Sequence, residues 1–213
     1  MHKRYITSMR LLICLSGADG SGKTTLTKLL SLYISPYDSI CIHWFRGTHL
    51  LASVLVRFLS IFNAFRGLCN PYYKVCIPRK LRELWIHIEF WSLLPHILVR
   101  MLLRKLCRFL ICDRGALDAI VWIITTLRYP SFVHSVYGRF LFRLAMKEKP
   151  VYLYTDLDAL ARRADVPKEF LAREFAVYSV LARYASHCSI NTGVGSPLDS
   201  LGGVLKCLKS QNR

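Results

Sequence analysis

The stretch that decides the fold lies near the start of the chain and reads Gly17-Ala18-Asp19-Gly20-Ser21-Gly22-Lys23-Thr24. It matches Gly-x-x-x-x-Gly-Lys-[Ser/Thr] in full, between an expected strand at 11–16 and an expected helix at 22–34. Glycines let the backbone curl so that its N–H groups point inward, and the helix N-terminus adds partial positive charge. The loop therefore predicts binding of nucleotide phosphates by Gly17, Asp19, Gly20, Ser21, Gly22, Lys23, Thr24 and Thr25; the alternative is a degenerate loop that no longer binds.

Three side chains in and beyond this loop are expected to carry chemistry. Lys23 is placed to reach the β- and γ-phosphates, and the Thr24 hydroxyl is placed to ligate Mg²⁺. The apolar run 109–112 ends in Asp113, a pattern typical of the carboxylate that holds Mg²⁺ or its water. Asp113 could also cap the helix that follows, and both roles can hold at once. ATP and Mg²⁺ are the expected cofactors, with Lys23 and Asp113 as catalytic residues.

Short apolar runs alternate with longer helical stretches along the chain. This alternation predicts an α/β fold with a parallel sheet covered by helices on both faces. At 213 residues the chain predicts one domain, and no linker is long enough to divide it. The expected strands are 11–16, 39–44, 108–113, 150–155 and 188–192, and the expected helices are 22–34, 48–66, 78–107, 114–127, 131–147, 157–164, 167–186 and 198–209, with Pro95 kinking or splitting the third.

The amino-acid composition limits the classes of function that the chain could have. With 53% hydrophobic residues the chain is not disordered, and 30 Lys and Arg against 13 Asp and Glu give a net charge of +17. That charge attracts polyanions, but the basic residues are dispersed and form no run. We expect small-molecule nucleotides as partners, with a homodimer allowed and nucleic acid unfavoured; a nucleic-acid-binding P-loop NTPase is the alternative.

The mean hydropathy of +0.30 raises the question of a membrane. A spanning helix needs about 18 consecutive apolar residues. The two best stretches, 50–65 and 84–103, are interrupted by Arg57 and by His87, Glu89 and His96, so no span is predicted. The apolar run 11–15 is short and leads into the phosphate loop, so we reject a signal peptide and expect a cytoplasmic protein. A peripheral protein that presents 48–66 to lipid is the alternative.

The eight cysteines show no Cys-x-x-Cys spacing, which excludes a zinc knuckle and a thioredoxin-like motif. Cys14, Cys41 and Cys112 lie in apolar strand-like runs, where we expect free thiols that behave as small hydrophobes. Pairing among the other cysteines is allowed for an intracellular protein of a hyperthermophile.

One helix face is a candidate for binding a base. Arg82, Trp85 and Glu89 share a face at helical spacing, with Phe90 beside it. A cation, an aromatic ring and a carboxylate could stack a base and bond its edge. The alternative is that Trp85 and Phe90 belong to the core and the two charges to the surface, as aromatic residues at this spacing usually do.

The motifs 19–25 and Asp113-Arg114, with an arginine-bearing segment after the fourth strand, resemble thymidylate kinases and, more broadly, P-loop kinases of nucleosides and nucleotides. The resemblance covers about residues 10–205. It implies a three-layer P-loop NTPase sandwich, with a five-stranded parallel sheet ordered 2-3-1-4-5. It also implies one domain over 1–213 with a short lid near 157–167, and transfer of phosphate from ATP to dTMP. A P-loop kinase of another small acceptor, such as a nucleoside, is the alternative.

The resemblance also assigns residues. Asp19 is similar to the loop residue that contacts the sugar hydroxyl of the acceptor. Arg46 and Arg114 resemble the arginines at its phosphate, so we expect a phosphorylated acceptor. Arg162 and Arg163 resemble the start of the lid; Gly20 stands where some members carry a loop arginine, so we expect a catalytic arginine from this pair, with Arg162 favoured. Asn191 and Thr192 fall where the family edges the adenine.

Two departures concern the acceptor side. The run Asp113-Arg114-Gly115-Ala116-Leu117-Asp118 lacks the aromatic residue that follows the Asp-Arg pair in thymidylate kinases. The Arg-Glu-Pro-Gly signature is reduced to Phe45-Arg46-Gly47. Thymidylate is therefore an inference from the resemblance and not from the residues of this pocket.

Overall fold

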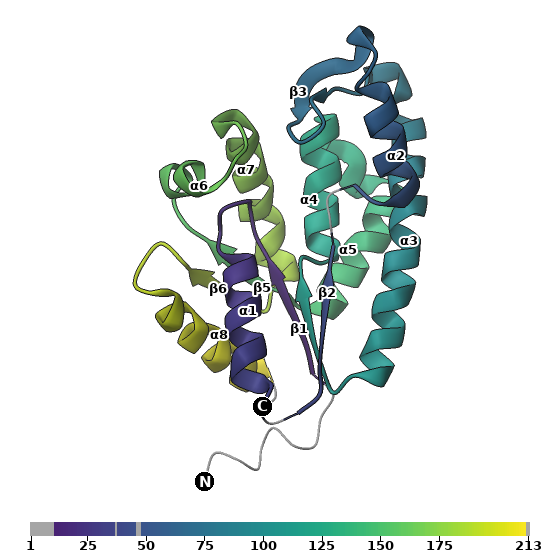
Figure 1. Cartoon of the computed structure of the whole chain (residues 1–213). Helices are drawn as coiled ribbons and strands as arrows, with labels where there is room; N and C mark the ends of the chain where they lie inside the picture. The colour runs from purple at the N-terminus through teal and green to yellow at the C-terminus, as the bar shows by residue number, and fades with distance from the viewer. Residues whose placement is uncertain (1–10, 37, 46–47, 212–213) are drawn as a thin grey trace.

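The sheet at the centre of the molecule has five parallel strands in the order β2-β4-β1-β5-β6 (Figure 1). The computed structural model describes residues 11–36, 38–45 and 48–211. The strands are β1 (Leu11–Ser16), β2 (Ile40–Trp44), β4 (Phe109–Asp113), β5 (Val151–Tyr154) and β6 (Cys188–Asn191). Counted along the chain, these five strands have the predicted order 2-3-1-4-5; the labels differ because the short strand β3 lies outside this sheet.

Helices cover both faces of the sheet, so its central strands are apolar throughout. All five residues of β4 are buried. On one face α1 (Lys23–Ile34) packs against α8 (Pro197–Gln211), and Leu26, Leu30 and Val204 meet Ile13 of β1 in one core cluster. The other face carries α3 (Arg82–Leu106), α4 (Ala116–Leu127), α5 (Val136–Glu148) and α7 (Lys168–Ala185).

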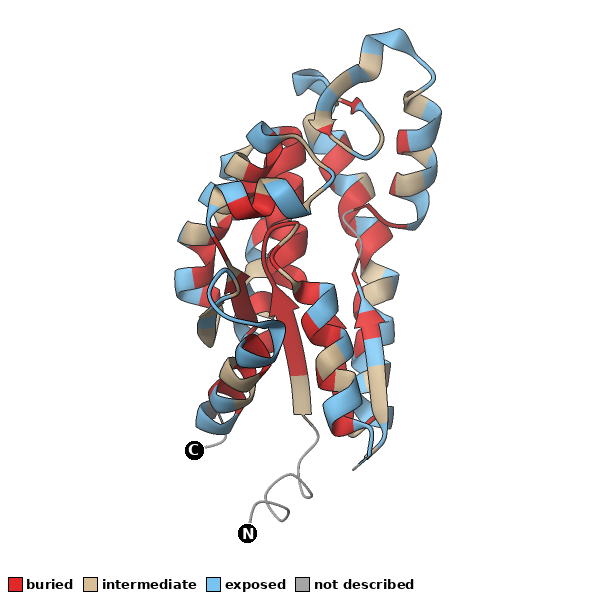
Figure 2. Cartoon of the chain, turned by 60° about the vertical axis from the view of Figure 1, so that its left-hand side comes forward, coloured by how far each residue is buried: buried red, intermediate tan, exposed pale blue. Residues whose placement is uncertain are grey.

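The second face is the thicker layer. Every residue of α4 is buried, and α4 packs against α3, α5 and α7, as the continuous red of its ribbon in Figure 2 shows. Between α4 and α5 the chain makes a short 3-10 turn, Pro130–His134. The short helix α6 (Leu157–Arg163) packs against α7. These layers confirm the predicted three-layer class.

The segment between β2 and α3 departs most from the predicted helix at 48–66. The helix α2 (Leu50–Leu59) ends early, followed by a 3-10 turn (Asn63–Phe65) and β3 (Arg66–Asn70). β3 turns back on itself with antiparallel bridges from Arg66 and Asn70 to Val75. After a further 3-10 turn (Arg79–Leu81), α3 runs unbroken through Pro95, so the predicted split there is wrong.

Among the described residues, one helical segment, Arg79–Leu106, is long and apolar enough to cross a membrane by length and composition. Its inner side is built into the fold, with Trp85, Ile86, Phe90 and Leu93 buried against the neighbouring helices. A core helix with this composition passes the same test.

Disulfides join six of the eight cysteines in pairs: Cys41–Cys107, Cys69–Cys76 and Cys188–Cys207. Cys14 and Cys112 are free and buried, as predicted. The prediction of a free thiol at Cys41 is wrong. Cys41 lies on the edge strand β2, where the end of α3 brings Cys107 to a Cα–Cα distance of 5.9 Å, a proximity across 66 residues that no sequence spacing reveals.

Candidate active site

The phosphate loop connects β1 to α1 and has the curled backbone that its glycines predict. Gly20 and Gly22 adopt positive φ angles of 82° and 85°. Gly22 is the N-cap of α1, and its carbonyl accepts the hydrogen bond from Leu26 N at 3.0 Å. A side chain at Gly20 would meet the carbonyl of Leu160 in α6. Gly20 is therefore required for two reasons, its backbone conformation and the close approach of α6, and Gly22 for its backbone conformation alone.

Lys23 is buried at the first position of α1, with 4% of its surface exposed. Its Nζ donates hydrogen bonds to the carbonyl oxygens of Gly17 at 2.7 Å and Ala18 at 2.8 Å. Burial lowers the pKa of Lys23, and the charge of Arg114 lowers it further. The ammonium group thus lies inside the loop, where it can contact phosphate oxygens.

Thr24 and Asp113 meet at the edge of the sheet where β1 and β4 end. Thr24 Oγ1 donates a hydrogen bond of 2.8 Å to Oδ2 of Asp113. The other carboxylate oxygen, Oδ1, is buried with no hydrogen-bond partner among the described residues. A hydroxyl and a carboxylate with a spare oxygen are hard ligands of the kind that Mg²⁺ prefers. These two residues fit a magnesium ion.

A cavity of about 560 Å³ opens beside the loop. This volume is within the usual range for small-molecule sites. It extends from the loop and α1 to the segment between β6 and α8. The residues that line it are Asp19, Gly20, Gly22, Lys23, Thr24, Thr25, Leu26, Arg114, Arg163, Thr192, Gly195, Pro197 and Ser200.

The two arginines at the end of α6 lie differently. Arg163 lines the cavity, and its Nη1 donates a 3.5 Å hydrogen bond to the carbonyl of Thr192. Arg162 is exposed and does not line the cavity. The N–H of Ala159 and, to a smaller extent, the charge of Arg162 hold the pKa of Asp156, the N-cap of α6, below its usual value. The geometry therefore favours Arg163 over Arg162, the reverse of the sequence-based order.

At the junction of β6 and the segment that follows, Thr192 lines the cavity and Asn191 does not. Thr192 Oγ1 donates to the carbonyls of Ser21 at 3.1 Å and Tyr154 at 3.2 Å, which ties this segment to the phosphate loop. Asn191 Oδ1 accepts a hydrogen bond from Gly193 N at 2.9 Å within its own turn. A direct contact of Asn191 with a base stays a prediction.

Asp19 and Arg114 form an ion pair on the edge of the same cavity, through Oδ1 of Asp19 and Nη2 of Arg114. The Tyr72 hydroxyl donates to Oδ2 of the same carboxylate. Burial alone would raise the pKa of Asp19, but Arg114, Lys23 and Tyr72 outweigh it and lower this pKa to about 2. Asp19 is therefore a carboxylate at neutral pH, and Arg114 already has a charged partner.

Three solved structures with a similar fold are kinases. A thymidylate kinase from Candida albicans matches with a TM-score of 0.58 at 15% identity, over 94% of this chain and 91% of its own. A thymidylate kinase from Ehrlichia chaffeensis has a TM-score of 0.53 at 17% identity, over 92% and 97% of the two chains. A shikimate kinase from Acinetobacter baumannii in complex with shikimate has a TM-score of 0.50 at 14% identity, over 98% of each chain. No family model and no curated protein matches the sequence.

The chain has a thymidylate kinase-like P-loop fold. At these identities the likeness shows the architecture alone, and it agrees with the position of the phosphate loop between β1 and α1. The residues of the site must therefore carry any conclusion about activity.

Buried polar residues that the sequence analysis missed hold the site in place. The carboxylate of Asp118 accepts hydrogen bonds from Ser16 Oγ at 2.5 Å, Gly115 N at 2.8 Å and Tyr178 OH at 2.8 Å. It thus joins the end of β1 to α4 and α7. Its place three residues after Gly115, the N-cap of α4, is the position of an acidic capping residue and was a readable signal.

A second buried group supports Arg114. The carbonyl of Arg114 accepts a hydrogen bond from Arg100 Nη2 at 2.8 Å, and Arg100 pairs with Glu148 at 2.6 Å. Glu148 also accepts from Ala116 N at 2.8 Å. Arg114 has a positive φ of 74°, so these contacts help to stabilise a backbone conformation that is unusual for a residue other than glycine. Nothing in the sequence spacing predicts this group.

Glu174 of α7 reaches the loop from the other side. Its Oε2 accepts a hydrogen bond from the backbone N of Asp19 at 3.2 Å. Burial and then the charge of Asp19 raise the pKa of Glu174 to about 7. This residue was also missed by the sequence analysis.

The helix face proposed for base stacking divides into separate contacts. Trp85 is buried in the core, and its Nε1 donates to Glu89 Oε1 at 3.1 Å. Arg82 lies over the ring of Tyr129 at 5.9 Å. Neither residue lines the 560 Å³ cavity, so the structure favours the core alternative for Trp85 and leaves substrate contacts of both as predictions. Arg46 falls outside the described residues.

Proposed function

We propose that the chain is a P-loop kinase that transfers the γ-phosphoryl group of ATP to a nucleoside monophosphate, with thymidylate as the first candidate. The observation that carries the proposal is one cavity lined by Lys23, by Thr24 with its partner Asp113, and by the Asp19–Arg114 pair. The phosphate loop supplies a donor side and the ion pair supplies an acceptor side, next to each other. Thymidylate rests on the resemblance of the motifs and on the fold.

The residues of this cavity divide the work of phosphoryl transfer. Lys23 and the loop N–H groups would bind the donor phosphates, and Thr24 and Asp113 would hold Mg²⁺. Bound Mg²⁺ supplies charge neutralisation on the phosphates during transfer. Because such transfer depends on positioning and charge stabilisation, the chain needs no nucleophilic side chain.

The acceptor side has two groups of opposite charge. The Arg114 guanidinium suits bidentate contact with a phosphate, while Asp19 suits a sugar hydroxyl. Arg114 and Asp19 form an ion pair, so the two groups are in contact. A nucleoside monophosphate would offer a phosphate to Arg114 and a sugar hydroxyl to Asp19.

We also propose that α6 and the segment that follows, 157–167, act as a lid over ATP within one domain. Arg163 supports this, because its one described hydrogen bond is long, at 3.5 Å, and exposed. The side chain can leave the Thr192 carbonyl for a phosphoryl group at small cost. We also propose that the protein is cytoplasmic. Its disulfides are compatible with this location in a hyperthermophile, whose intracellular proteins are rich in disulfides.

A panel of acceptors tests the proposed function. Purified protein is given ATP and Mg²⁺ with dTMP, other nucleoside monophosphates, nucleosides, shikimate and single-stranded polynucleotide, and ADP formation is measured. We expect turnover with one or more monophosphates. Turnover with nucleosides or shikimate alone would favour another small acceptor, and ATP hydrolysis stimulated by polynucleotide and lost at high salt would favour the nucleic-acid-binding alternative.

A substitution connects the result to the site. Arg114→Met should raise the KM for the monophosphate at least about tenfold and the KM for ATP much less, because a bidentate contact to the acceptor is lost. The matched control is Arg139→Met, at an exposed position on α5, which should leave both KM values unchanged. Equal effects of Arg114→Met on the two substrates would contradict the assignment of the acceptor side.

A further inference from the structure

The hairpin formed by residues 65–76 has a turn that is held by hydrogen bonds and a disulfide. Gly67 N donates to Lys74 O at 2.9 Å, and Cys76 N donates to Phe65 O at 2.7 Å. The disulfide Cys69–Cys76 closes the hairpin next to its turn. Within the turn, Asn70 Oδ1 accepts a hydrogen bond from Tyr72 N at 3.2 Å. The turn therefore has few conformations available, and Tyr72 has a fixed backbone position.

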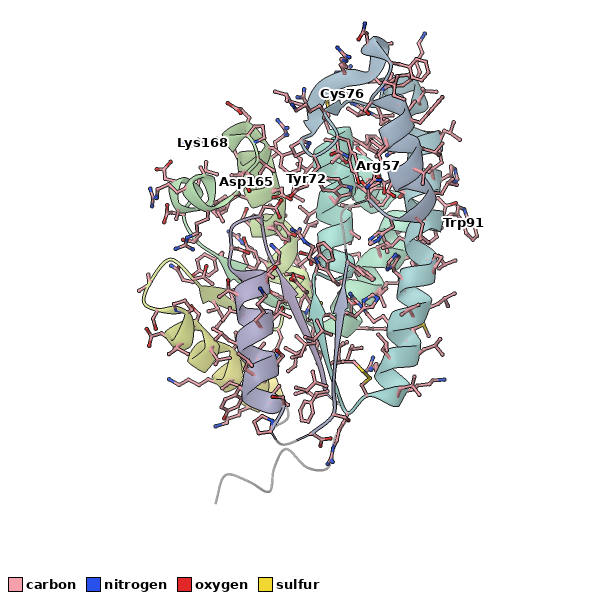
Figure 3. All side chains as sticks on the ribbon, viewed as in Figure 1. Arg57, Tyr72, Cys76, Trp91, Asp165 and Lys168 are labelled. Atoms are coloured by element: carbon pink, nitrogen blue, oxygen red, sulfur yellow. A yellow bond between two sulfur atoms is a disulfide. The ribbon has the colours of Figure 1, made fainter. Side chains whose placement is uncertain are left out.

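This hairpin brings Tyr72 to the acceptor side of the cavity. Figure 3 shows Tyr72 between the β3 hairpin and α7, on the side of the molecule where the phosphate loop lies. Its ring stacks on Trp122 of α4, with centroids 5.8 Å apart, and its hydroxyl donates to Oδ2 of Asp19. The residue is 55% exposed, although the carboxylate that it contacts belongs to a residue that is 8% exposed. Because the Tyr72 side chain is exposed and its hydroxyl makes one described hydrogen bond, it can move without disturbing the core.

The two oxygens of Asp19 have different partners. Oδ1 pairs with Arg114, and Oδ2 accepts from the Tyr72 hydroxyl. Under the proposed function, on which this inference rests, the sugar hydroxyl of the acceptor must also donate to Asp19. Of the two partners, the Arg114 side chain is charged and only 20% exposed, so its bond is the stronger one. The tyrosine hydroxyl is the partner that a sugar hydroxyl can replace.

We propose that Tyr72 gates the acceptor site: its hydroxyl holds the Asp19 oxygen that the acceptor's sugar hydroxyl takes, and acceptor binding moves Tyr72 off that oxygen. When an acceptor with the sugar hydroxyl binds, its hydrogen bond to Asp19 replaces the one from Tyr72, so the net gain in binding free energy is small. An acceptor without the hydroxyl leaves Tyr72 in place. Tyr72 therefore weakens acceptor binding and reduces discrimination between the two kinds of acceptor.

The test combines one substitution with two acceptors. Tyr72→Phe removes the hydroxyl and keeps the ring on Trp122. With the nucleoside monophosphate that the enzyme uses best, we expect its KM to fall at least about threefold while the KM for ATP stays constant, because a hydrogen bond to a charged group no longer has to be broken. With the dideoxy analogue of that monophosphate, the substitution should leave KM unchanged. A structural role of Tyr72 would not produce this difference between two acceptors.

Two further variants sharpen the test. Tyr73→Phe is the matched control, since Tyr73 lies next to Tyr72 with its ring beside Arg57, and it should change neither KM. Replacing Cys69 and Cys76 together by Ser should free the turn and lower the acceptor KM in the same direction. Combined with Tyr72→Phe, this change should add nothing further, because both act on one contact.

The outcomes separate this inference from the function on which it rests. Wild-type protein that phosphorylates no nucleoside monophosphate overturns both. Wild-type activity together with an unchanged or raised acceptor KM in Tyr72→Phe overturns the gate and leaves the kinase assignment standing. An equal fall in KM for the parent acceptor and its dideoxy analogue also overturns the gate, because the effect would not pass through the sugar hydroxyl.

Discussion

Thr24 and Asp113, 89 positions apart in the sequence, are joined by a 2.8 Å hydrogen bond from Thr24 Oγ1 to Asp113 Oδ2. The bond connects the first turn of α1 to the end of β4. The bond engages one carboxylate oxygen and leaves Oδ1, which has no hydrogen-bond partner among the described residues, for the metal role that we propose.

Asp113→Asn tests the metal role. Asparagine keeps the shape and one acceptor oxygen but removes the charge, so we expect kcat to fall on the order of a hundredfold and the Mg²⁺ requirement to rise. Initial rates measured across a Mg²⁺ titration give both quantities. Asp38→Asn, at a surface ion pair with Arg108, is the control and should behave as wild type. An unchanged Mg²⁺ dependence in Asp113→Asn would exclude the assignment.

The end of α6 offers a matched pair of arginines. Arg163→Ala should lower the single-turnover rate of transfer about a hundredfold or more, with ATP affinity changed much less, because the transferring group loses a cation. Arg162→Ala should stay near the wild-type rate, since Arg162 does not line the cavity. Rapid-quench measurements decide between them. A larger loss in Arg162→Ala would restore the order that the sequence favours.

The raised pKa of Glu89 predicts that the stability of the protein depends on pH. Burial raises its pKa to about 8, and Trp85 and Thr48 donate hydrogen bonds to it at 3.1 and 3.4 Å. In the unfolded chain the pKa of this glutamic acid is about 4.3. The folded protein therefore holds the Glu89 proton more tightly than the unfolded chain does. This difference lowers the free energy of unfolding as the pH rises from about 4.3 to 8.

Glu89→Gln should remove this dependence, because the amide keeps the oxygen and carries no charge. Relative to wild type, the free energy of unfolding of the variant should rise by a few kcal/mol between pH 5 and pH 8. Denaturant unfolding at both pH values measures the difference. Burial lowers the pKa of His43 to about 4, which acts in the opposite direction, but both proteins carry His43 and its effect cancels. A constant difference between the two proteins would contradict the buried-acid assignment.

The disulfides should differ in their effect on stability according to the length of chain that they close. Cys41–Cys107 spans 66 residues and Cys69–Cys76 spans 7. Loop entropy alone gives about 4 kcal/mol for the first and about 2 kcal/mol for the second. Replacing each pair by alanine and measuring Tm without reductant should therefore show the larger loss for the first pair. An equal or reversed order would show that the entropic account does not describe this protein.

The sheet could be predicted from the sequence because its strands are short apolar runs and its phosphate loop has a fixed place between a strand and a helix. The loop residues and Asp113 follow from that pattern, since their chemistry is local to a strand end. The segment 60–78 could not be predicted, because the β3 hairpin depends on the Cys69–Cys76 disulfide and on contacts with α4.

The contacts on the acceptor side could not be predicted from the sequence. Asp19 and Arg114 were named, but their ion pair, and the approach of Tyr72 and Glu174, depend on segments that are far apart in the chain. Helical spacing puts Trp85 beside Arg82 and Glu89, which allowed either a stacking platform or a place in the core. Spacing fixes which residues share a face, but only the packing of α3 decides whether that face meets a cavity or the core.

The central claim is that the loop around Lys23 binds the phosphates of a donor whose γ-phosphoryl group is transferred. The direct measurement follows labelled γ-phosphate from ATP to dTMP in wild-type protein and in Lys23→Ala, with circular dichroism to show that both are folded. The account predicts labelled dTDP from the wild type and at least about a thousandfold less from the folded variant, because the loop keeps its shape but loses its cation. Labelled product formed at comparable rates by both proteins would contradict it.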